Sequence, residues 1–440
     1  MIALGQKIKE ARKEKKMTQE ELADRNISRS LISLIENDLS YPSMLTLEYL
    51  AMKLDKHISY FLVEDDTDSL NLIADLEYLL DTEEYMQIID KAESYIKYKI
   101  NNLENTKKQY LGVLCCILGI AYYKTNNQLT FDYLSRSVDY LKSEGNNKYI
   151  SKAYNYLGLI MFSQKNYELM ENYLHQADGC FNVITYENIN QKLNILYNLS
   201  LAYYYQHKYC LSSDILQEAL TYSRKHEIYY SFGEFNMLLA LSYKNIDRID
   251  DAIECNIKAL KYYKLTENKF MEHRCYTNMS ILFRVCGDHY NSLNYINDAI
   301  IYFQSIGDEI KLINAQVEKA ICMFVFNNDN DLIIEMIDSI INQPNCSETA
   351  KGELFSILAS LKLKNNDYMG SLNLFKEAEK RLFDYDDTEM NTFVYRGLSK
   401  IYEHLNDPLK SNLYITKLNK LLKDRPYYKK YLKDNRVFNA

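Results

Sequence analysis

The sequence has few of the residues that interrupt regular secondary structure. Its 440 residues include only 12 Gly and 4 Pro, and no Trp. All-β and α/β proteins need many tight turns, for which Gly and Pro are the usual residues. Their scarcity, with a 47% share of hydrophobic residues, favours an all-α protein. One hydrophobic core rarely serves more than about 250–300 residues, so we expect several domains or a repeat array.

The sequence also lacks cysteine motifs and segments that would enter a membrane. The nine Cys are scattered and none has C-x-x-C spacing, which argues against a zinc site and a disulfide framework. We therefore predict reduced, mostly buried thiols, with no metal and no cofactor. The start, MIALGQKIKEARKEKK, lacks the apolar core of a signal peptide, and no run of about 20 apolar residues follows. These features predict a cytoplasmic protein without membrane contact.

Charge is distributed unevenly along the chain. Residues 1–62 carry 10 Lys and Arg against 9 Asp and Glu, a net charge of +1, whereas the rest of the chain carries 42 against 51. A polyanion would be repelled by the long acidic part but not by the first 62 residues. The overall charge of −8 therefore does not exclude nucleic-acid binding through the amino-terminal segment.

The first 62 residues show the periodicity of five short helices. Apolar Leu4, Ile8 and Ala11 indicate the first helix, and Thr18 with Glu21 forms a T-x-x-E capping box that opens a second. The other helical signals are Leu22 and Ala23 in the second helix, Ser28 with Ile32 and Ile35 in the third, 41–43 with Leu47, Leu50, Ala51 and Leu54 in the fourth, and 58–62 in the fifth. Two short helices joined by a tight turn are typical of a helix-turn-helix.

The motifs of this segment resemble the phage-repressor-like (XRE) DNA-binding domain over about sixty residues. They are TQEELA (18–23), SRSLISLIEN (28–37), YPS (41–43) and the closing ISYFL (58–62). The resemblance implies a five-helix domain whose third helix enters the major groove. It also implies an internal ion pair between Arg12 and Glu36. The turn has Asn26 where many of these domains have Gly, and Asn tolerates the left-handed conformation that such a turn needs.

The predicted DNA contacts divide into two kinds. Residues at helix starts and basic residues contact phosphates, whereas the outward face of the third helix reads bases, and Arg29 suits a two-bond contact to guanine. The predicted DNA-binding residues are Thr18 and Gln19 at the second helix, Ser28, Arg29, Ser30, Ser33 and Leu34 at the third, and Asn37, Lys13 and Lys16 at the DNA backbone.

The remaining chain is a repeat with a period near 40 residues. The small or apolar residues that align in the middle of successive apolar segments are Leu76, Gly119, Gly158, Ser200, Ala240, Ser280, Ala320, Ala359 and Ser399. Most units then continue with a polar turn and an amphipathic helix that ends in Ala, at Ala177, Ala219, Ala259, Ala299 and Ala378. This pattern of a small residue, a turn and a late Ala resembles the tetratricopeptide repeat, but its period is longer than the usual 34 residues.

The predicted domains are accordingly a DNA-binding domain (1–62), an acidic linker (63–69), a repeat domain (70–424) and a basic, aromatic tail (425–440) that either packs on the last repeat or is loose. About nine helix pairs fit the repeat domain, wound into a right-handed α-solenoid whose first helices line a concave groove. The predicted groove residues are Asn155, Asn194, Asn198, Tyr204, Glu234, Asn236, Lys244, Arg274, Asn278, Arg284 and Asn314. Carboxamides can bracket a peptide backbone, and the cations suit a carboxylate.

An XRE-like domain followed by such repeats resembles the RRNPP family of peptide-sensing regulators, which includes PlcR, NprR and Rgg. The resemblance implies a quorum-sensing transcription factor, a homodimer on a pseudo-palindromic operator in double-stranded DNA, controlled by a short imported signalling peptide. It implies dimerisation through the carboxy-terminal repeats, and it assigns Asn198 and Asn278 to the peptide backbone.

Two other functions fit the same sequence. One is an interaction scaffold that sequesters a protein partner, such as a phosphorelay component. The other is a phage-type lysis–lysogeny receptor, or a repressor without a small ligand. No combination of nucleophile, base and acid in the sequence predicts an enzyme.

Overall fold

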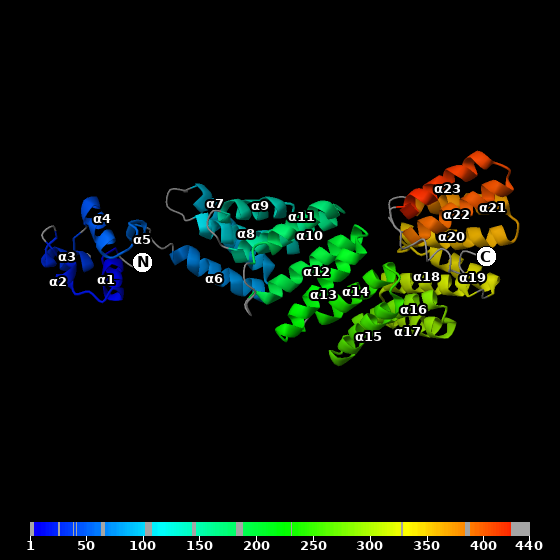
Figure 1. Ribbon diagram of the computed structural model, residues 1–440, viewed down its shortest axis with the longest axis horizontal. Helices are drawn as coiled ribbons and strands as arrows, with labels where there is room; N and C mark the ends of the chain where they lie inside the picture. Colours follow the sequence, from blue (N-terminus) through cyan, green and yellow to red (C-terminus); the bar gives the residue numbers. More distant parts are fainter. Residues whose placement is uncertain are drawn as a thin grey trace. The chain divides into compact units, whose positions relative to one another are not determined.

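In the computed structural model the described part of the chain is all-α, as predicted (Figure 1). The residues described are 4–24, 27–37, 39–40, 42–62, 67–101, 108–142, 147–181, 188–229, 231–326, 329–382 and 388–423. Regular secondary structure in these ranges consists of helices alone. None of these helices combines the length and the apolar character that a membrane span requires.

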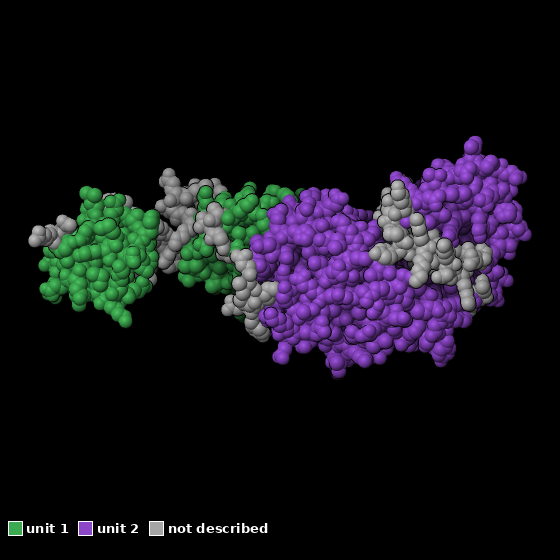
Figure 2. Space-filling model, viewed as in Figure 1, with its two compact units in different colours: residues 1–157 green, residues 158–440 purple. Residues whose placement is uncertain are grey.

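The chain divides into two compact units, residues 1–157 and 158–440 (Figure 2). This division falls within a helix of the repeat array and not at the predicted linker. In a repeat array each helix pair contacts mainly the next pair in sequence. The boundary between the two compact units therefore need not coincide with the boundary between the DNA-binding domain and the repeat domain. The predicted tail, 425–440, and Asn26 of the predicted turn lie outside the described residues.

The amino-terminal domain contains the five helices that the sequence predicts: α1 (Leu4–Glu14), α2 (Gln19–Leu22), α3 (Arg29–Glu36), α4 (Met44–Lys53) and α5 (Ser59–Leu62). Its core joins the predicted apolar faces, including Ile8, Leu22, Ile32, Leu50 and Phe61, which are all nearly inaccessible to solvent. The second helix is one residue shorter than predicted. Ala23 takes an extended conformation (ψ 155°) and caps α2, because its N–H bonds to the carbonyl of Gln19.

The repeat domain consists, within the described ranges, of nine helix pairs. Those that begin in the first unit are α6 (Thr67–Asp81), α7 (Tyr85–Asn101), α8 (Lys108–Lys124), α9 (Thr130–Leu141) and α10 (Asn147–Ser163). The others are α11 (Tyr167–Asp178), α12 (Ile189–Tyr205), α13 (Tyr209–Lys225), α14 (Phe232–Asn245), α15 (Ile249–Leu265), α16 (Lys269–Cys286), α17 (His289–Ser305), α18 (Glu309–Val325), α19 (Asn330–Ile341), α20 (Glu348–Lys364), α21 (Tyr368–Leu382), α22 (Thr388–His404) and α23 (Pro408–Lys423).

The start of α6 corrects the predicted linker. The helix begins at Thr67, so residues 67–69 of the predicted linker 63–69 are helical. Thr and Asp are favoured at helix starts, where Asp also suits the positive end of the helix dipole. The polar residues 67–69, which suggested a linker, are therefore the first residues of α6. The other linker residues, 63–66, lie outside the described residues.

The aligned small residues hold each helix pair together. All nine of them are buried, as are the five late Ala residues, which are completely inaccessible. At Gly119 an added Cβ would lie 2.8 Å from the side chain of Leu134 on the paired helix. Ser280 and Ser399 are within hydrogen-bond distance of Ser292 and Ser411, again on the paired helices. The small residue therefore sets the close approach of the two helices, as its position in the repeat predicts.

The turn inside the pairs repeats as well. Seven residues after the aligned residue the backbone is left-handed, with φ between 55° and 77° in every such turn that the described residues include. The residues at this position are Glu83, Asn126, Lys165, His207, Asp247, Gly287, Asn366 and Asn406. Seven of these eight have side chains, although a left-handed conformation costs a residue with a Cβ roughly 1–2 kcal/mol. The turn is therefore fixed by the packing of the two helices and not by glycine.

The first helices of successive pairs lie side by side in the second unit. Helix α12 contacts α14, α16 contacts α18, α18 contacts α20, and α20 contacts α22. Side chains on the exposed face of this layer therefore come together from repeats about 40 residues apart. This arrangement positions the candidate ligand site described below.

Candidate DNA-binding and ligand-binding sites

A buried ion pair ties α1 to α3. Arg12 Nε and Nη2 donate to the two carboxylate oxygens of Glu36 at 2.5 and 2.8 Å, and Arg12 Nη1 donates to the carbonyl of Met17 at 2.7 Å. The side chains are 11% and 0% exposed. The predicted pairing of Arg12 with Glu36 is present in the structure, and it fixes the angle between the first helix and the predicted recognition helix.

The same carboxylate holds Gln19. The amide Nε2 of Gln19 donates to Glu36 Oε2 at 2.7 Å, so this side chain joins the start of α2 to the end of α3. The sequence assigned Gln19 to a DNA phosphate. In the structure one N–H of this amide is used within the domain, so Gln19 also positions the helix-turn-helix, and its contact with a phosphate stays a prediction.

Three other predicted DNA contacts are helix caps. Thr18 accepts a hydrogen bond from the N–H of Glu21 while the Glu21 carboxylate accepts from the N–H of Thr18, which completes the predicted capping box. Ser28 Oγ accepts from the N–H of Leu31, and Asn37 Nδ2 donates to the carbonyl of Ser33. These side chains define where α2 and α3 begin and end.

The outward face of α3 is accessible. Arg29 is 65% exposed, with its guanidinium 3.9 Å from the exposed carboxylate of Glu20. Ser30 is exposed, Ser33 is half-buried, and Leu34 is 43% exposed. An exposed ion pair of this length contributes little and is easily exchanged for a phosphate or a base. Lys13 and Lys16, on and after α1, are exposed too.

A cavity of about 440 Å³ opens on the layer of first helices in the second unit. It brings together three predicted groove residues, Lys244 from α14, Arg284 from α16 and Asn314 from α18. The residues that the sequence did not single out are Thr277, Ile281, Val317, Glu318, Ile321, Ser347, Thr349, Ala350, Glu353 and Met390. Several stand 40 residues apart, as Ile281 and Ile321 do, so extending the repeat register would have found them.

The structure changes the predicted role of Arg284, which does line the cavity, and corrects the predicted position of Asn236. Arg284 is buried in an ion pair, with Nε and Nη2 donating to the Glu318 carboxylate at 2.7 and 3.3 Å and side-chain exposures of 7% and 8%. Its charge is thus already paired in the wall of the cavity. Asn236 is only 1% exposed, and its Nδ2 donates to the carbonyl of Phe232 in its own helix. It therefore lies inside the helix packing and not on the exposed face of the groove.

The other groove predictions lie on first helices at helical spacing. Asn194 is exposed and Asn198, one turn later on α12, is half-buried; Arg274 and Asn278 are half-buried one turn apart on α16. The Nδ2 of Asn278 is buried and lacks a hydrogen-bond partner. Tyr204 accepts a hydrogen bond from Asn245 Nδ2 at 3.4 Å. Asn155 on α10 and Glu234 on α14 are half-buried as well.

The cysteines are free thiols, and six of the nine are buried. None of the nine, all of which are in the described ranges, forms a disulfide. Burial raises the pKa of Cys115 and of Cys116 to about 12, so both are thiols at neutral pH. No group of three or more His, Cys, Asp or Glu in the described part of the chain is arranged to hold a metal ion.

Comparison with known proteins identifies the amino-terminal domain. Residues 8–61 match the family model described as "Helix-turn-helix". This segment is a helix-turn-helix domain. A stretch of 65 residues, 14% of the chain, is 43% identical to the immunity repressor protein of Bacillus phage phi105. That match spans 45% of the repressor, so the chain corresponds to less than half of this relative.

Comparison of structures identifies the fold of the rest. The apo form of the quorum sensor NprR from B. thuringiensis superimposes with a TM-score of 0.57, covering 81% of this chain and 99% of NprR at 15% identity. A Rap protein in complex with Competence and Sporulation Factor gives a TM-score of 0.54, with 82% and 99% coverage at 16% identity. The predicted solenoid of tetratricopeptide-like helix pairs is thereby confirmed, and the resemblance to the RRNPP regulators is supported at the level of fold.

Proposed function

We propose that the protein is a cytoplasmic transcriptional regulator of the RRNPP kind. In this proposal its helix-turn-helix binds a pseudo-palindromic operator as a homodimer, and a short imported peptide bound to the first helices of the repeats controls it. The carrying observation is that one chain joins a helix-turn-helix with an exposed α3 face to a repeat fold in which Lys244 and Asn314 line a 440 Å³ cavity. The likeness in fold to NprR, which is described as a quorum sensor, supports control of this protein by a signal molecule.

The DNA-binding role predicts a specific effect at Arg29. Changing Arg29→Ala should weaken operator binding by about 1–3 kcal/mol, because a guanidinium paired with a base or phosphate is lost. The fold should be unchanged, since Arg29 is 65% exposed. Fluorescence anisotropy of labelled operator DNA measures this, with Lys261→Ala, an exposed cation on α15, as the matched control. Equal affinity of Arg29→Ala and the control would remove the base-reading role.

The peptide-binding role predicts a selective loss of response. The double change Asn198→Ala, Asn278→Ala should abolish the effect of peptide while the ligand-free protein still binds DNA. An unpaired buried amide costs roughly 1–3 kcal/mol, which a carbonyl of a bound peptide would recover at Asn278. Asn294→Ala, an exposed position on the second helix α17, is the matched control. A normal peptide response in the double variant would place the site elsewhere.

The decisive experiment measures DNA binding with and without peptide. Labelled DNA from the region upstream of the gene is titrated with full-length protein at near-physiological salt, because protein–DNA affinity depends steeply on salt. The titration is repeated with peptides of 5–10 residues from the carboxyl end of the nearest small reading frame. Sub-micromolar, competitor-resistant binding that shifts with peptide supports the proposal.

A second candidate is a phage-type repressor that needs no ligand, and the 43% identity to the phi105 immunity repressor over the DNA-binding segment favours it. Specific DNA binding that no peptide alters would select this candidate. Absence of specific DNA binding in both titrations would instead select the scaffold function, in which the repeats hold a protein partner.

A further inference from the structure

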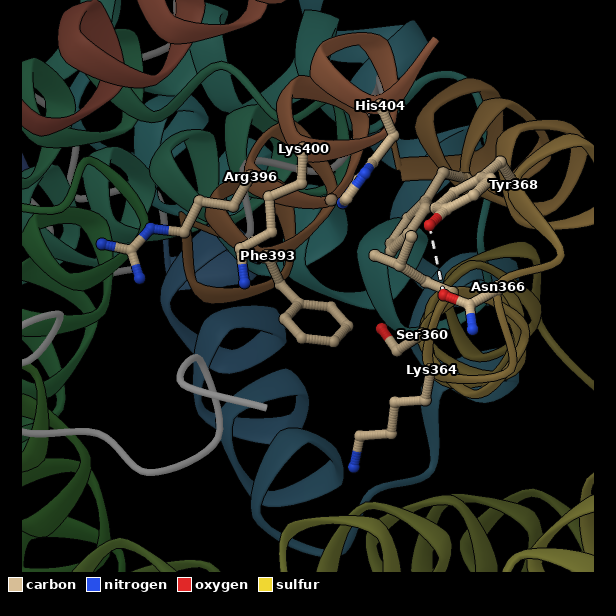
Figure 3. A pocket seen from close by; sticks show the side chains of 11 residues that line it. Ser360, Lys364, Asn366, Tyr368, Phe393, Arg396, Lys400 and His404 are labelled. Carbon is tan, nitrogen blue, oxygen red and sulfur yellow. Dashed lines mark hydrogen bonds between the residues drawn. The ribbon is translucent and has the colours of Figure 1, made fainter.

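A smaller pocket of about 220 Å³ lies among α20, α21 and α22 (Figure 3). Its labelled cationic side chains point in different directions. The ammonium of Lys364 lies over the Phe324 ring, 5.2 Å from its centroid, and Tyr368 stacks on His404 with ring centroids 4.7 Å apart. The pocket therefore does not concentrate its charge on one point. Polar groups converge instead in the amino-terminal domain, at the end of α2.

The helix α2 is too short to hold its own position. It has four residues, and Leu22 is its one buried side chain. Isolated helices shorter than about 12 residues are marginal in water, because the first turn is costly to form. The start of α2 is held by the amide of Gln19, which donates to Glu36 Oε2 at 2.7 Å. The other end needs a partner as well if α2 and α3 are to keep one relative placement.

The ammonium of Lys53, at the end of α4, supplies that partner. It donates to the carbonyl oxygens of Leu22 at 2.9 Å and Ala23 at 3.3 Å, and it lies 3.5 Å from Asp24 Oδ2. An ammonium has three N–H donors, so three oxygens suit it. The last carbonyls of a helix lack partners within the helix and carry partial negative charge, which a cation stabilises. Lys53 therefore ties the end of α2 to the end of α4.

The same contacts reach the connection between α2 and α3. The N–H of Asp24 donates to the Ile27 carbonyl at 3.0 Å, and the N–H of Ile27 donates to Asp24 Oδ1 at 3.3 Å. The Asp24 carboxylate thus has one oxygen on the connection and the other beside Lys53. The two side chains are only 25% and 30% exposed, so salt screens their attraction less than that of a fully exposed pair. A displacement of Lys53 would be felt at the start of α3.

We propose that Lys53 is a positioning residue that sets how selectively the helix-turn-helix reads its operator. The start of α2 is predicted to contact phosphates and the face of α3 to read bases, so both contacts fit one site only if the two helices keep a fixed placement. Without Lys53 the base contacts are lost first, because non-specific binding depends on charge more than on fit. This inference rests on the proposed DNA binding and adds a residue of α4 to it.

The test compares specific with non-specific binding by the full-length protein. Selection from random DNA duplexes with the unaltered protein defines the operator, and each variant is titrated with this operator and with a random-sequence duplex at the same salt. Lys53→Met retains the apolar stem and should lower the ratio of the two affinities about tenfold, roughly the effect of one lost base contact. Lys53→Arg, which retains a cation, should restore most of the ratio. Partial unfolding lowers both affinities by the same factor and leaves their ratio unchanged.

The matched control is Lys56→Met, which removes the same charge from the same end of α4. Lys56 pairs with Glu14 at 2.8 Å and lies over the Tyr60 ring, so its loss should change the ratio less than about threefold. Asp24→Asn leaves both carbonyl acceptors in place, and its effect should fall between those of Lys53→Met and Lys56→Met. Asp24→Asn decides the question if Lys53→Met binds neither DNA.

The outcomes separate this inference from the proposed function. If the unaltered protein prefers its operator while Lys53→Met, or Asp24→Asn in its place, has the same ratio as Lys56→Met, the positioning role alone is overturned. If selection yields no preferred sequence, the proposed DNA binding fails and the positioning role fails with it.

Discussion

Replacing Glu36 by Ala is expected to destabilise the amino-terminal domain by about 3–5 kcal/mol. The change removes one partner of a buried ion pair and leaves the guanidinium of Arg12, whose side chain is 11% exposed, without its carboxylate. Gln19 loses its acceptor at the same time. Since domains of this size are stabilised by only about 5–15 kcal/mol, α1 and α3 should open far more often.

Amide hydrogen exchange in the full-length protein measures this locally, by the protection of α1 and α3 amides. Glu48→Ala is the matched control, because Glu48 is an exposed carboxylate on α4 and its loss should change protection by less than about 0.5 kcal/mol. The double change Arg12→Met, Glu36→Leu should recover most of the protection, since no unpaired charge is then buried. Equal protection in Glu36→Ala and Glu48→Ala would show that the pair contributes no stability.

The same pair makes the domain sensitive to acid. Burial raises the pKa of Glu36, but hydrogen bonds from Arg12 and Gln19 and the charge of Arg12 lower it by more, so its pKa lies below its ordinary value. A carboxylate with a lowered folded-state pKa contributes stability above its unfolded-state pKa of about 4.3. That stability is lost as pH falls through the folded-state value. Protection of the α1 and α3 amides should therefore decrease as the pH is lowered past about 4. The decrease should be less steep in the double variant Arg12→Met, Glu36→Leu, which lacks the buried carboxylate.

The fold was predictable from sequence because each of its levels has a periodic signal. The spacing of Leu4, Ile8 and Ala11 predicts one helix face, and the small residues that recur about every 40 positions predict the helix pairs. The left-handed turn was not predictable, because Gly287 is the only glycine among its eight described examples. In the other seven turns, tertiary packing overrides the preference of these residues for negative φ. The residue type at this position therefore does not predict the left-handed conformation.

The candidate sites were less predictable, since they depend on register and on partners. A shift of one or two residues turns a side chain from the groove into the helix packing, as at Asn236. An ion pair between two repeats also cannot be predicted from the periodicity of one helix. Arg284 and Glu318 form such a pair, on different repeats and 34 residues apart. The cap roles of Thr18 and Ser28 were predictable because capping is local in sequence.

Replacing Glu318 by Ala is expected to destabilise the middle repeats by about 3–5 kcal/mol. Arg284, whose side chain is 7% exposed, would then be buried without a carboxylate, and Cys322 Sγ, which donates to Glu318 Oε1 at 3.3 Å, would lose its acceptor. Protection of α16 and α18 amides against hydrogen exchange measures the effect. Glu335→Ala, an exposed carboxylate on α19, is the matched control and should change protection by less than about 0.5 kcal/mol.

The double change Arg284→Met, Glu318→Leu separates the structural role of this pair from a role in ligand binding. Apolar residues of similar volume should restore protection of α16 and α18, because neither leaves a buried charge. The 440 Å³ cavity would nevertheless lose two of its polar wall residues. If the peptide binds there, the double variant should bind operator DNA normally and respond to peptide at least tenfold more weakly. A restored fold with an unchanged peptide response would show that Arg284 and Glu318 serve only to join the repeats.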